Sequence, residues 1–260
     1  MAATLQRPVP ARAARNWIYL FERGFLYACQ GLSSESVRFS VSVLLSPTGQ
    51  PFEVEVEGHR ACAVGFVVQP GAWRRLRAAD VPLVSIGLTA AHPWFRTIST
   101  LKMPHGLLPL SRADFAHCDD ALEAARLGAL SPPAARSLSD AVMQVIAARL
   151  PAPRPLDARI KRVISMVRED FRVPLDTLAT EVHLSYHRLS HLFSESMGLA
   201  LRNYVLARKL DVAFALASRG MTMTQIAAAA GFADAAHFSR IWMRAGGAPP
   251  SYFLNNDDIQ

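Results

Sequence analysis

An internal repeat near the C-terminus restricts the fold more than any other feature of the sequence. Residues 175–193 read LDTLATEVHLSYHRLSHLF, and residues 223–242 read MTQIAAAAGFADAAHFSRIW. The segments align at an offset of 48 residues, which becomes 49 because the second copy has one more residue in its turn. Each copy indicates a helix, a tight turn and a second helix, so we expect the same helical hairpin twice.

The apolar positions of the repeat predict how each hairpin packs. The small Ala179 and Ala227 let the two helices of a copy approach closely, and Ser185 and Asp234 are typical N-caps for the second helices. Each second helix is anchored by one apolar face, formed by Leu189, Leu192 and Phe193 in the first copy and by Phe238, Ile241 and Trp242 in the second. The opposite face stays free, as in a helix-turn-helix motif whose second helix enters the DNA major groove.

The free faces supply candidate DNA-binding residues. They are Tyr186, His187, Arg188, Ser190, His191 and Ser194 in the first copy and Ala235, Ala236, His237, Ser239 and Arg240 in the second. Arg240 is the strongest candidate for a bidentate contact to guanine, whereas an alanine can meet only a thymine methyl group. A long helix over residues 201–217 would hold the two second helices about one DNA turn apart, roughly 34 Å. Its Arg208 and Lys209 are candidates for phosphate contacts, with solvated surface residues as the alternative.

Residues 157–255 resemble the AraC/XylS family of bacterial transcription regulators. The likeness rests on LATEVHLSYHRLSHLFSESMG, on the connector positions Tyr204, Leu210, Ala213 and Leu216, and on IAAAAGFADAAHFSRIWMRAGGAPPSYF. The resemblance implies binding to double-stranded promoter or operator DNA, activation more than repression, and contact with RNA polymerase. It also implies that His187, Ser190 and His191 face bases, and that Ala235 and Ala236 stand where relatives carry polar base readers.

The N-terminal half has the pattern of an antiparallel β structure. In FEVEVEG, residues 52–58, apolar and acidic residues alternate, which is typical of a half-buried strand. Residues 38–46, 61–69 and 81–88 are further predicted strands, separated by turns rich in proline and glycine. Residues 112–128 and 132–149 are predicted helices, the second with Ser131 as its cap. This half resembles, more loosely, the family's sensor, a cupin-like barrel followed by dimerisation helices.

The whole chain is therefore predicted to have an α+β fold. We expect a disordered arm over residues 1–16, a cupin-like sensor or dimerisation domain over 17–150 and a proline-rich linker over 151–156. Residues 157–260 are predicted to form an all-α DNA-binding domain of about seven helices, with a short last helix after Pro250.

The sensor half offers candidate effector-binding residues, namely Phe39, Val41, Trp73, Arg74, Arg75 and Arg77. Apolar strand residues beside an arginine cluster suit a small anion or an aromatic acid. The alternative is that the apolar residues are core and the arginines are solvated. The half would then bind no ligand and serve only in dimerisation or protein contacts.

The stripe formed by Leu138, Val142, Val145 and Ile146 suits a dimer interface or packing on the barrel. An enzyme with a DNA-binding tail is a third interpretation.

Composition limits the other classes of function. The net charge of +7 suggests an anionic partner, but residues 157–260 hold 12 Lys and Arg against 10 Asp and Glu, a net charge of only +2. The four histidines of the N-terminal half form no H-x-H pair, so neither a metal nor a cofactor is expected. No stretch predicts a membrane span. Three scattered cysteines indicate reduced thiols, and we expect a cytoplasmic homodimer without enzymatic activity.

Overall fold

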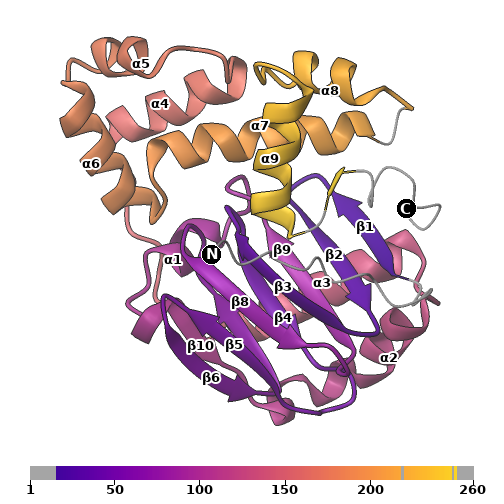
Figure 1. The fold of residues 1–260 in the computed structure, drawn as a ribbon. Coiled ribbons are helices and arrows are strands. Elements are labelled where there is room, and N and C mark those ends of the chain that lie inside the picture. Colours follow the sequence, from indigo (N-terminus) through magenta and orange to yellow (C-terminus); the bar gives the residue numbers. More distant parts are fainter. Residues whose placement is uncertain (1–15, 218–219, 248, 251–260) are drawn as a thin grey trace, which may run out of the picture.

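The protein consists of a β-rich N-terminal part beneath a layer of helices (Figure 1). The computed structural model describes residues 16–217, 220–247 and 249–250. The strands within these ranges are β1 (Trp17–Phe21), β2 (Gly24–Cys29), β3 (Leu32–Val37), β4 (Val41–Leu45), β5 (Phe52–Val56), β6 (His59–Ala63), β7 (Gly65–Val68), β8 (Trp73–Ala78), β9 (Leu83–Leu88) and β10 (Leu107–Pro109). The α+β class predicted from the sequence is confirmed.

The strands of the predicted cupin-like barrel form two antiparallel sheets, and the barrel is not closed. One sheet has the order β1-β2-β9-β4-β7-β10, and the other has the order β3-β8-β5-β6. The predicted strand over residues 38–46 is broken, because residues 38–40 carry the chain from β3 in one sheet to β4 in the other. The predicted strand over 61–69 is broken at Val64 for the same reason, between β6 and β7. These crossings leave the two sheets facing each other without a continuous ring of hydrogen bonds.

The alternation predicted for residues 52–56 is confirmed in β5. Phe52 and Val54 are buried in the core between the sheets, whereas Glu53 lies on the other face. Glu55 is only 9% exposed, although it also points away from that core. It is covered by arginines from neighbouring strands, among them Arg60 and Arg75, whose guanidinium nitrogens lie 3.3 and 3.7 Å from its carboxylate.

Helices and short turns cover the large sheet. They are α1 (Phe95–Ser99), η1 (Pro104–Gly106), η2 (Arg112–Cys118), α2 (Asp119–Leu127) and α3 (Pro132–Ala147). Ser131 caps α3 as predicted, by accepting a hydrogen bond from Ala134 N at 3.4 Å. The stripe with Leu138, Val142 and Ile146 is buried against the strands and η2. Of the two placements predicted for this stripe, packing on the chain's own β structure is the one observed.

The C-terminal part is helical throughout its described residues. Its helices are α4 (Ala158–Glu169), α5 (Leu175–Glu181), α6 (Tyr186–Met197), α7 (Leu201–Ala217), α8 (Met223–Ala229) and α9 (Ala235–Gly246). The short helix predicted after Pro250 falls outside the described residues. Within the ranges that the structure describes, no helix has both the length and the apolar character needed to cross a membrane.

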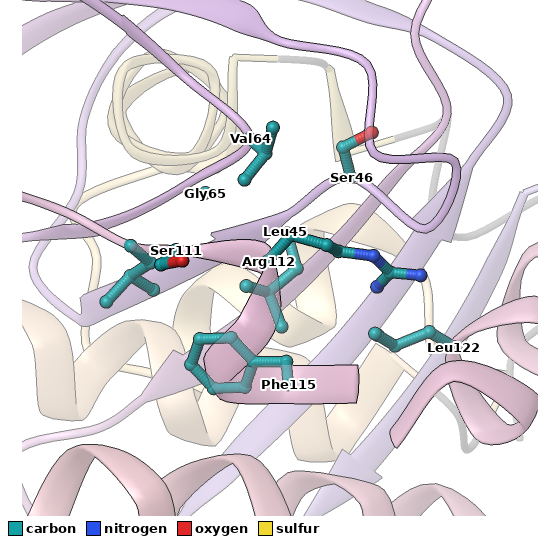
Figure 2. Close-up of a pocket in the computed structure, with 9 residues that line it drawn as sticks. Leu45, Ser46, Val64, Gly65, Ser111, Arg112, Phe115 and Leu122 are labelled. Atoms are coloured by element: carbon teal, nitrogen blue, oxygen red, sulfur yellow. The ribbon is translucent and has the colours of Figure 1, made fainter. Parts of the chain in front are cut away.

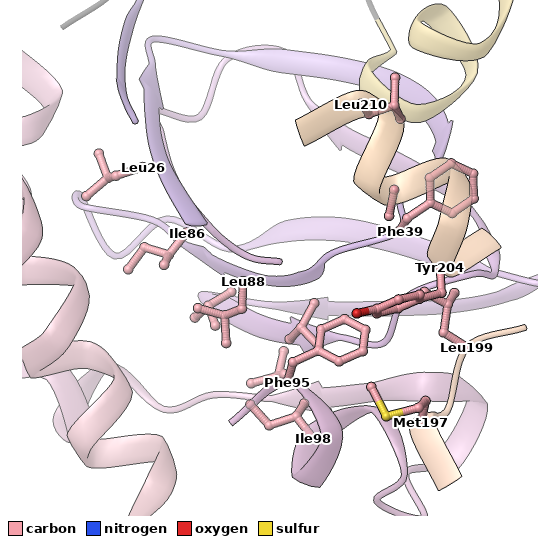
Figure 3. Packing of buried hydrophobic residues seen from close by; sticks show 14 of the residues in the cluster. Leu26, Phe39, Ile86, Leu88, Phe95, Ile98, Met197, Leu199, Tyr204 and Leu210 are labelled. Carbon is pink, nitrogen blue, oxygen red and sulfur yellow. The ribbon is translucent and has the colours of Figure 1, made fainter. Parts of the chain in front are cut away.

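The two parts share one continuous apolar core. Phe39, Phe95 and Ile98 of the N-terminal part lie close to Leu199 and Tyr204 of the C-terminal part (Figure 3). The core therefore runs from the large sheet through α1 to the connector α7.

Hydrogen bonds at the ends of α6 and α9 reinforce this interface. Ser99 Oγ donates to the carbonyl oxygen of Met197 at 2.6 Å, at the last residue of α6. Arg38 Nη2 donates to the carbonyl oxygen of Gly246 at 3.2 Å, at the last residue of α9. The C-terminal ends of α6 and α9 are thus both held by the N-terminal part.

Candidate DNA-binding surface

The same backbone geometry builds the turn in both copies of the repeat. Leu184 N donates to Ala179 O at 3.0 Å, and Phe232 N donates to Ala227 O at 2.9 Å. The residue before each donor has a left-handed backbone, with φ of 55° at His183 and 71° at Gly231. Glycine adopts this conformation without steric cost, whereas histidine does not. The two copies therefore use one turn with different residues at its strained position.

Caps and anchors fix the second helix of each copy, α6 and α9, which we call the reading helices. Ser185 Oγ accepts a hydrogen bond from Arg188 N at 3.3 Å, and Asp234 Oδ1 accepts one from His237 N at 2.6 Å. Both predicted N-caps are confirmed. The anchor positions Leu189, Phe193, Phe238 and Trp242 are at most 2% exposed, and Leu192 and Ile241 are half-buried. Each reading helix thus turns its opposite face outward.

Four of the six contact residues predicted on α6 are exposed on its outer face. Tyr186, His187, Arg188 and His191 are exposed, whereas Ser190 and Ser194 are half-buried. The Ser194 hydroxyl donates to Ser190 O at 2.8 Å, so its hydrogen bond stays within the helix. Sequence reasoning missed Glu195, whose carboxylate lies 3.4 Å from His191 Nδ1. The spacing of four residues on one helix face is the signal that could have found it.

The outer face of α9 has a different composition. Ala236 and Arg240 are exposed, and Ala235, His237 and Ser239 are half-buried. The His237 ring packs edge-on against Phe232, with 5.6 Å between ring centres, so His237 also supports the turn. Within the described residues, Arg240 forms no salt bridge. The exposed Met243 and Arg244 lie one turn further along this face, and the sequence prediction omitted them.

The connector residues predicted to contact phosphate are engaged inside the protein. Arg208 Nη1 lies 3.0 Å from Asp211 Oδ2. Lys209 Nζ donates to Gly231 O at 2.8 Å and lies 6.0 Å from the centre of the Phe232 ring. Burial lowers the pKa of Lys209, and the nearby charge of Arg172 adds to this effect. Both residues therefore hold α7, and Lys209 ties it to the second turn.

The predicted effector-binding residues do not converge on one site. Phe39 and Val41 are buried in the core. Along β8, Arg74 points into the protein, whereas Trp73, Arg75 and Arg77 lie on the outer face. The Arg75 guanidinium lies 2.6 Å from Glu35 and 5.2 Å from the centre of the Trp73 ring, and Arg77 lies 2.6 Å from Glu53. The alternation of a β-strand thus separates Arg74 from Arg75 and Arg77.

The pocket drawn in Figure 2 is too small for an organic effector. It lies between the β structure and the segment with Arg112, Phe115 and Leu122, and its cavity volume is about 10 Å³. That volume corresponds to about one water molecule. None of the predicted effector-binding residues lines it.

Comparisons with known proteins agree with this geometry. Residues 178–256, from α5 to beyond α9, match the family model described as a helix-turn-helix domain. The arabinose operon regulatory proteins of Salmonella typhimurium and Escherichia coli are each 28% identical to this chain over 103 residues, which cover 38% of it. These residues cover 37% and 35% of the two relatives. The C-terminal domain is that of the AraC/XylS family.

Solved structures extend the likeness beyond the AraC-type domain. ToxT from Vibrio cholerae O395 superposes with a TM-score of 0.55 at 12% identity, over 94% of this chain and 98% of that one. ToxT of strain SCE256 bound to an unsaturated fatty acid gives a TM-score of 0.55 at 12% identity, over 95% and 98% of the two chains. At this level of identity the two chains are alike in fold. The arrangement of a β-rich domain before a helical domain is therefore shared along nearly the whole chain.

Proposed function

We propose that this protein is a sequence-specific DNA-binding transcription regulator in which α6 and α9 are the two reading helices. The observation that carries the proposal is the repeat itself. Two hairpins with the same turn, the same kind of cap and the same buried anchors each expose one face of a reading helix. The connector α7 joins the hairpins, which suits insertion into successive major grooves on one side of the duplex.

The two reading helices are proposed to contribute differently. α6 presents His187, Arg188 and His191, so it has several side chains that can donate hydrogen bonds to base edges or phosphates. α9 presents Arg240 beside two alanines. We infer that α9 lies close to the wall of the major groove and makes one main base contact through Arg240. In this proposal α6 contributes more of the sequence specificity.

For the N-terminal domain we propose that it senses a small effector. Two observations support this role. The domain holds the C-terminal ends of both reading helices, so a change within it can reach the DNA-binding surface. Moreover, ToxT, which shares this fold, has been solved with an unsaturated fatty acid bound. The proposed regulator has no catalytic activity, and homodimerisation, promoter activation and contact with RNA polymerase remain predictions.

A second candidate role is that the N-terminal domain binds no ligand and acts in dimerisation or protein contacts. The pocket of Figure 2 supports this role, because its cavity volume of about 10 Å³ leaves no room for an organic ligand there. Any such interface would not use the stripe around Leu138 and Val142, because those residues are buried within the chain.

Selection from a random DNA library tests the proposed DNA binding. The full-length protein should enrich one motif with two conserved segments about 10 base pairs apart, the spacing of successive major grooves. Lys102→Ala is a matched control, because Lys102 is exposed on the N-terminal domain, and it should enrich the same motif. If the protein binds selected and random DNA with equal affinity at physiological salt, the proposal is wrong.

A further inference from the structure

We propose that Arg38 and Arg74 form a buried site for a small oxyanion, a carboxylate or a phosphate, and that its occupation draws Arg38 away from the end of α9. This inference rests on the proposed function, in which the N-terminal domain responds to an effector, and it names the chemistry of that effector.

Arg74 is a buried cation without an anionic partner in the described residues. It points inward from β8 and is only 4% exposed. Its Nε donates to Ser36 Oγ at 3.4 Å, but its Nη1 is buried without a hydrogen-bond partner. Burial lowers the pKa of Arg74, and the positive charge of Arg38 lowers it further. Ser36, which pairs with Arg74 across the sheet and accepts its hydrogen bond, lies two residues before Arg38. The buried Arg74 and the half-buried Arg38 therefore lie at the same end of this sheet.

Arg38 has the same deficit. It follows β3. Among the described residues its side chain donates one hydrogen bond, from Nη2 to Gly246 O, while Nε is buried and unpartnered. The arginines on the outer face of the same sheet differ, because Arg75 and Arg77 lie within 2.6 Å of glutamate oxygens. Among the described residues, neither Arg38 nor Arg74 forms a salt bridge. Buried charges are ordinarily paired, so a site with two cations and no acid calls for an anion.

Ser36 adds a buried hydroxyl group beside Arg74, and Ser42 adds another buried hydroxyl group to the space between the sheets. Ser36 and Ser42 are 4% and 1% exposed, and Ser42 Oγ has no hydrogen-bond partner. Alternation places Ser42 on the same face of β4 as Leu44, which packs in the core between the sheets. Guanidinium groups match carboxylate and phosphate oxygens in geometry, and hydroxyl groups can donate to the remaining lone pairs.

Arg38 links this site to the reading helix α9. Its Nη2 now donates to Gly246 O, in the last turn of α9, where helix carbonyl groups carry partial negative charge. An oxyanion carries a full charge and would compete for the same guanidinium group. The C-terminal end of α9 packs against β3. Gly247 follows the last residue of α9, and a Cβ atom built on it would stand 3.1 Å from Ser34 Cβ. Loss of the Arg38 contact would therefore loosen α9 from the N-terminal domain.

Thermal unfolding of the full-length chain tests the site itself. Sodium phosphate and sodium benzoate are each compared with sodium chloride at equal ionic strength. We expect at least one of them to raise the unfolding temperature by roughly 3–6 °C at about tenfold excess over its Kd. The salt that works distinguishes a phosphate from a carboxylate ligand. If neither salt acts beyond sodium chloride, the proposed site does not exist.

Variants at neighbouring positions of β8 show whether Arg74 causes the anion-dependent rise in unfolding temperature. Arg74→Met should abolish the shift while unfolding at a temperature no lower than wild type, because it removes an unpaired buried charge. Arg75→Met changes the neighbouring residue on the outer face and should keep the shift. An Arg74→Met protein that still responds would overturn the proposal. Should that variant fail to fold, Arg38→Met gives the same test.

DNA affinity separates this inference from the proposed function. With the motif obtained by selection, the active anion should change the affinity of the wild type at least several-fold and leave Arg38→Met unchanged. Specific DNA binding without any anion effect would refute the oxyanion site and leave the regulator intact. An anion-dependent stability shift without specific DNA binding would refute the regulator and leave the site intact.

Discussion

Arg240 is the side chain on which the proposed base recognition by α9 depends. It is exposed, it forms no salt bridge within the described ranges, and its neighbours Ala235 and Ala236 cannot replace its hydrogen bonds. We predict that Arg240→Ala lowers affinity for the selected motif about 5- to 150-fold and removes the preference at one base pair. Fluorescence anisotropy with the motif and with single-base variants measures both effects.

Two comparisons make the Arg240 prediction specific. Arg23→Ala removes the same charge from an exposed site in the β1–β2 turn and should leave affinity within about twofold. His187→Ala and His191→Ala should relax the preference at other positions of the motif, which α6 is proposed to contact. If alanine at 187 and 191 changed nothing while Arg240→Ala removed all discrimination, the proposed division between the helices would be reversed.

His183 and Gly231 occupy the same strained position in the two turns, so their substitutions should have opposite effects. His183→Gly should raise the free energy of unfolding by up to about 1 kcal/mol, because glycine relieves the left-handed backbone. Gly231→Ala should lower it by about 1 kcal/mol or more, since its Cβ would also stand 3.3 Å from Phe171. Urea unfolding followed by circular dichroism measures both. Effects of equal sign would show that backbone strain does not dominate there.

At the scale of elements, the connector α7 contains Asp211, whose charged form is disfavoured by burial. Burial raises the pKa of Asp211 to about 6, and its pairing with Arg208 opposes the rise. The folded-state pKa thus lies above the ordinary value of 3.8, so the folded protein binds this proton more tightly than the unfolded chain. The stability contributed by the protonated group is present below about pH 4 and is lost as the pH rises through 6.

Asp211→Asn should therefore stabilise the protein at pH 7.5 and have little effect at pH 4.5. We expect about 1 kcal/mol at the higher pH, because Asp211 keeps 29% of its side-chain surface exposed and the variant loses the Arg208 pair. Urea titrations at the two pH values provide the measurement. A variant that is less stable at pH 7.5 would show that the Arg208 pair outweighs the cost of burial.

The hairpins could be predicted from the sequence because local residues determine them. The caps Ser185 and Asp234 accept hydrogen bonds from the first turn of their own helix, and the anchors Phe193 and Trp242 recur at the same position of both copies, so spacing alone located them. Arg208 and Lys209 could not be assigned in the same way. Their partners are a carboxylate one turn away and a carbonyl at the second turn, and only packing of α7 on that turn brings Lys209 to it.

The β structure also combines a feature that local sequence determines with features that depend on distant segments. The alternation that separates Arg74 from Arg75 and Arg77 was present in the sequence, so their division between the two faces could have been predicted. The passage of residues 38–40 between sheets could not, because it depends on which distant strands pair with β3 and β4. For the same reason, the contact between Arg38 and Gly246 had no signal in either segment alone.

For the whole molecule, the ends of the reading helices are the points where the two domains meet. Ser99 binds the last carbonyl of α6, and Arg38 binds the last carbonyl of α9. The apolar core continues across the same boundary (Figure 3). A rotation of one domain against the other would break both hydrogen bonds, so the spacing of α6 and α9 on DNA is coupled to the N-terminal domain.

Gly198 tests this coupling, because it ends α6 with φ of 63° directly above α1. A Cβ atom there would lie 2.2 Å from Ser99 O, closer than real atoms approach. Gly198→Ala should cost about 1 kcal/mol for its left-handed backbone and additional free energy for displacing α1 from α6. We also expect it to change DNA affinity several-fold, since α6 has to shift.

Gly220→Ala is the matched control for Gly198→Ala. Gly220 has a similar φ of 68°, but no atom of the described residues lies within 4 Å of its added Cβ. It should cost only the backbone term of about 1 kcal/mol and leave DNA affinity close to that of the wild type. Calorimetry and anisotropy on both variants separate backbone strain from contact between the domains. Equal losses of stability and affinity in the two variants would show that the contact of Gly198 with Ser99 does not position α6.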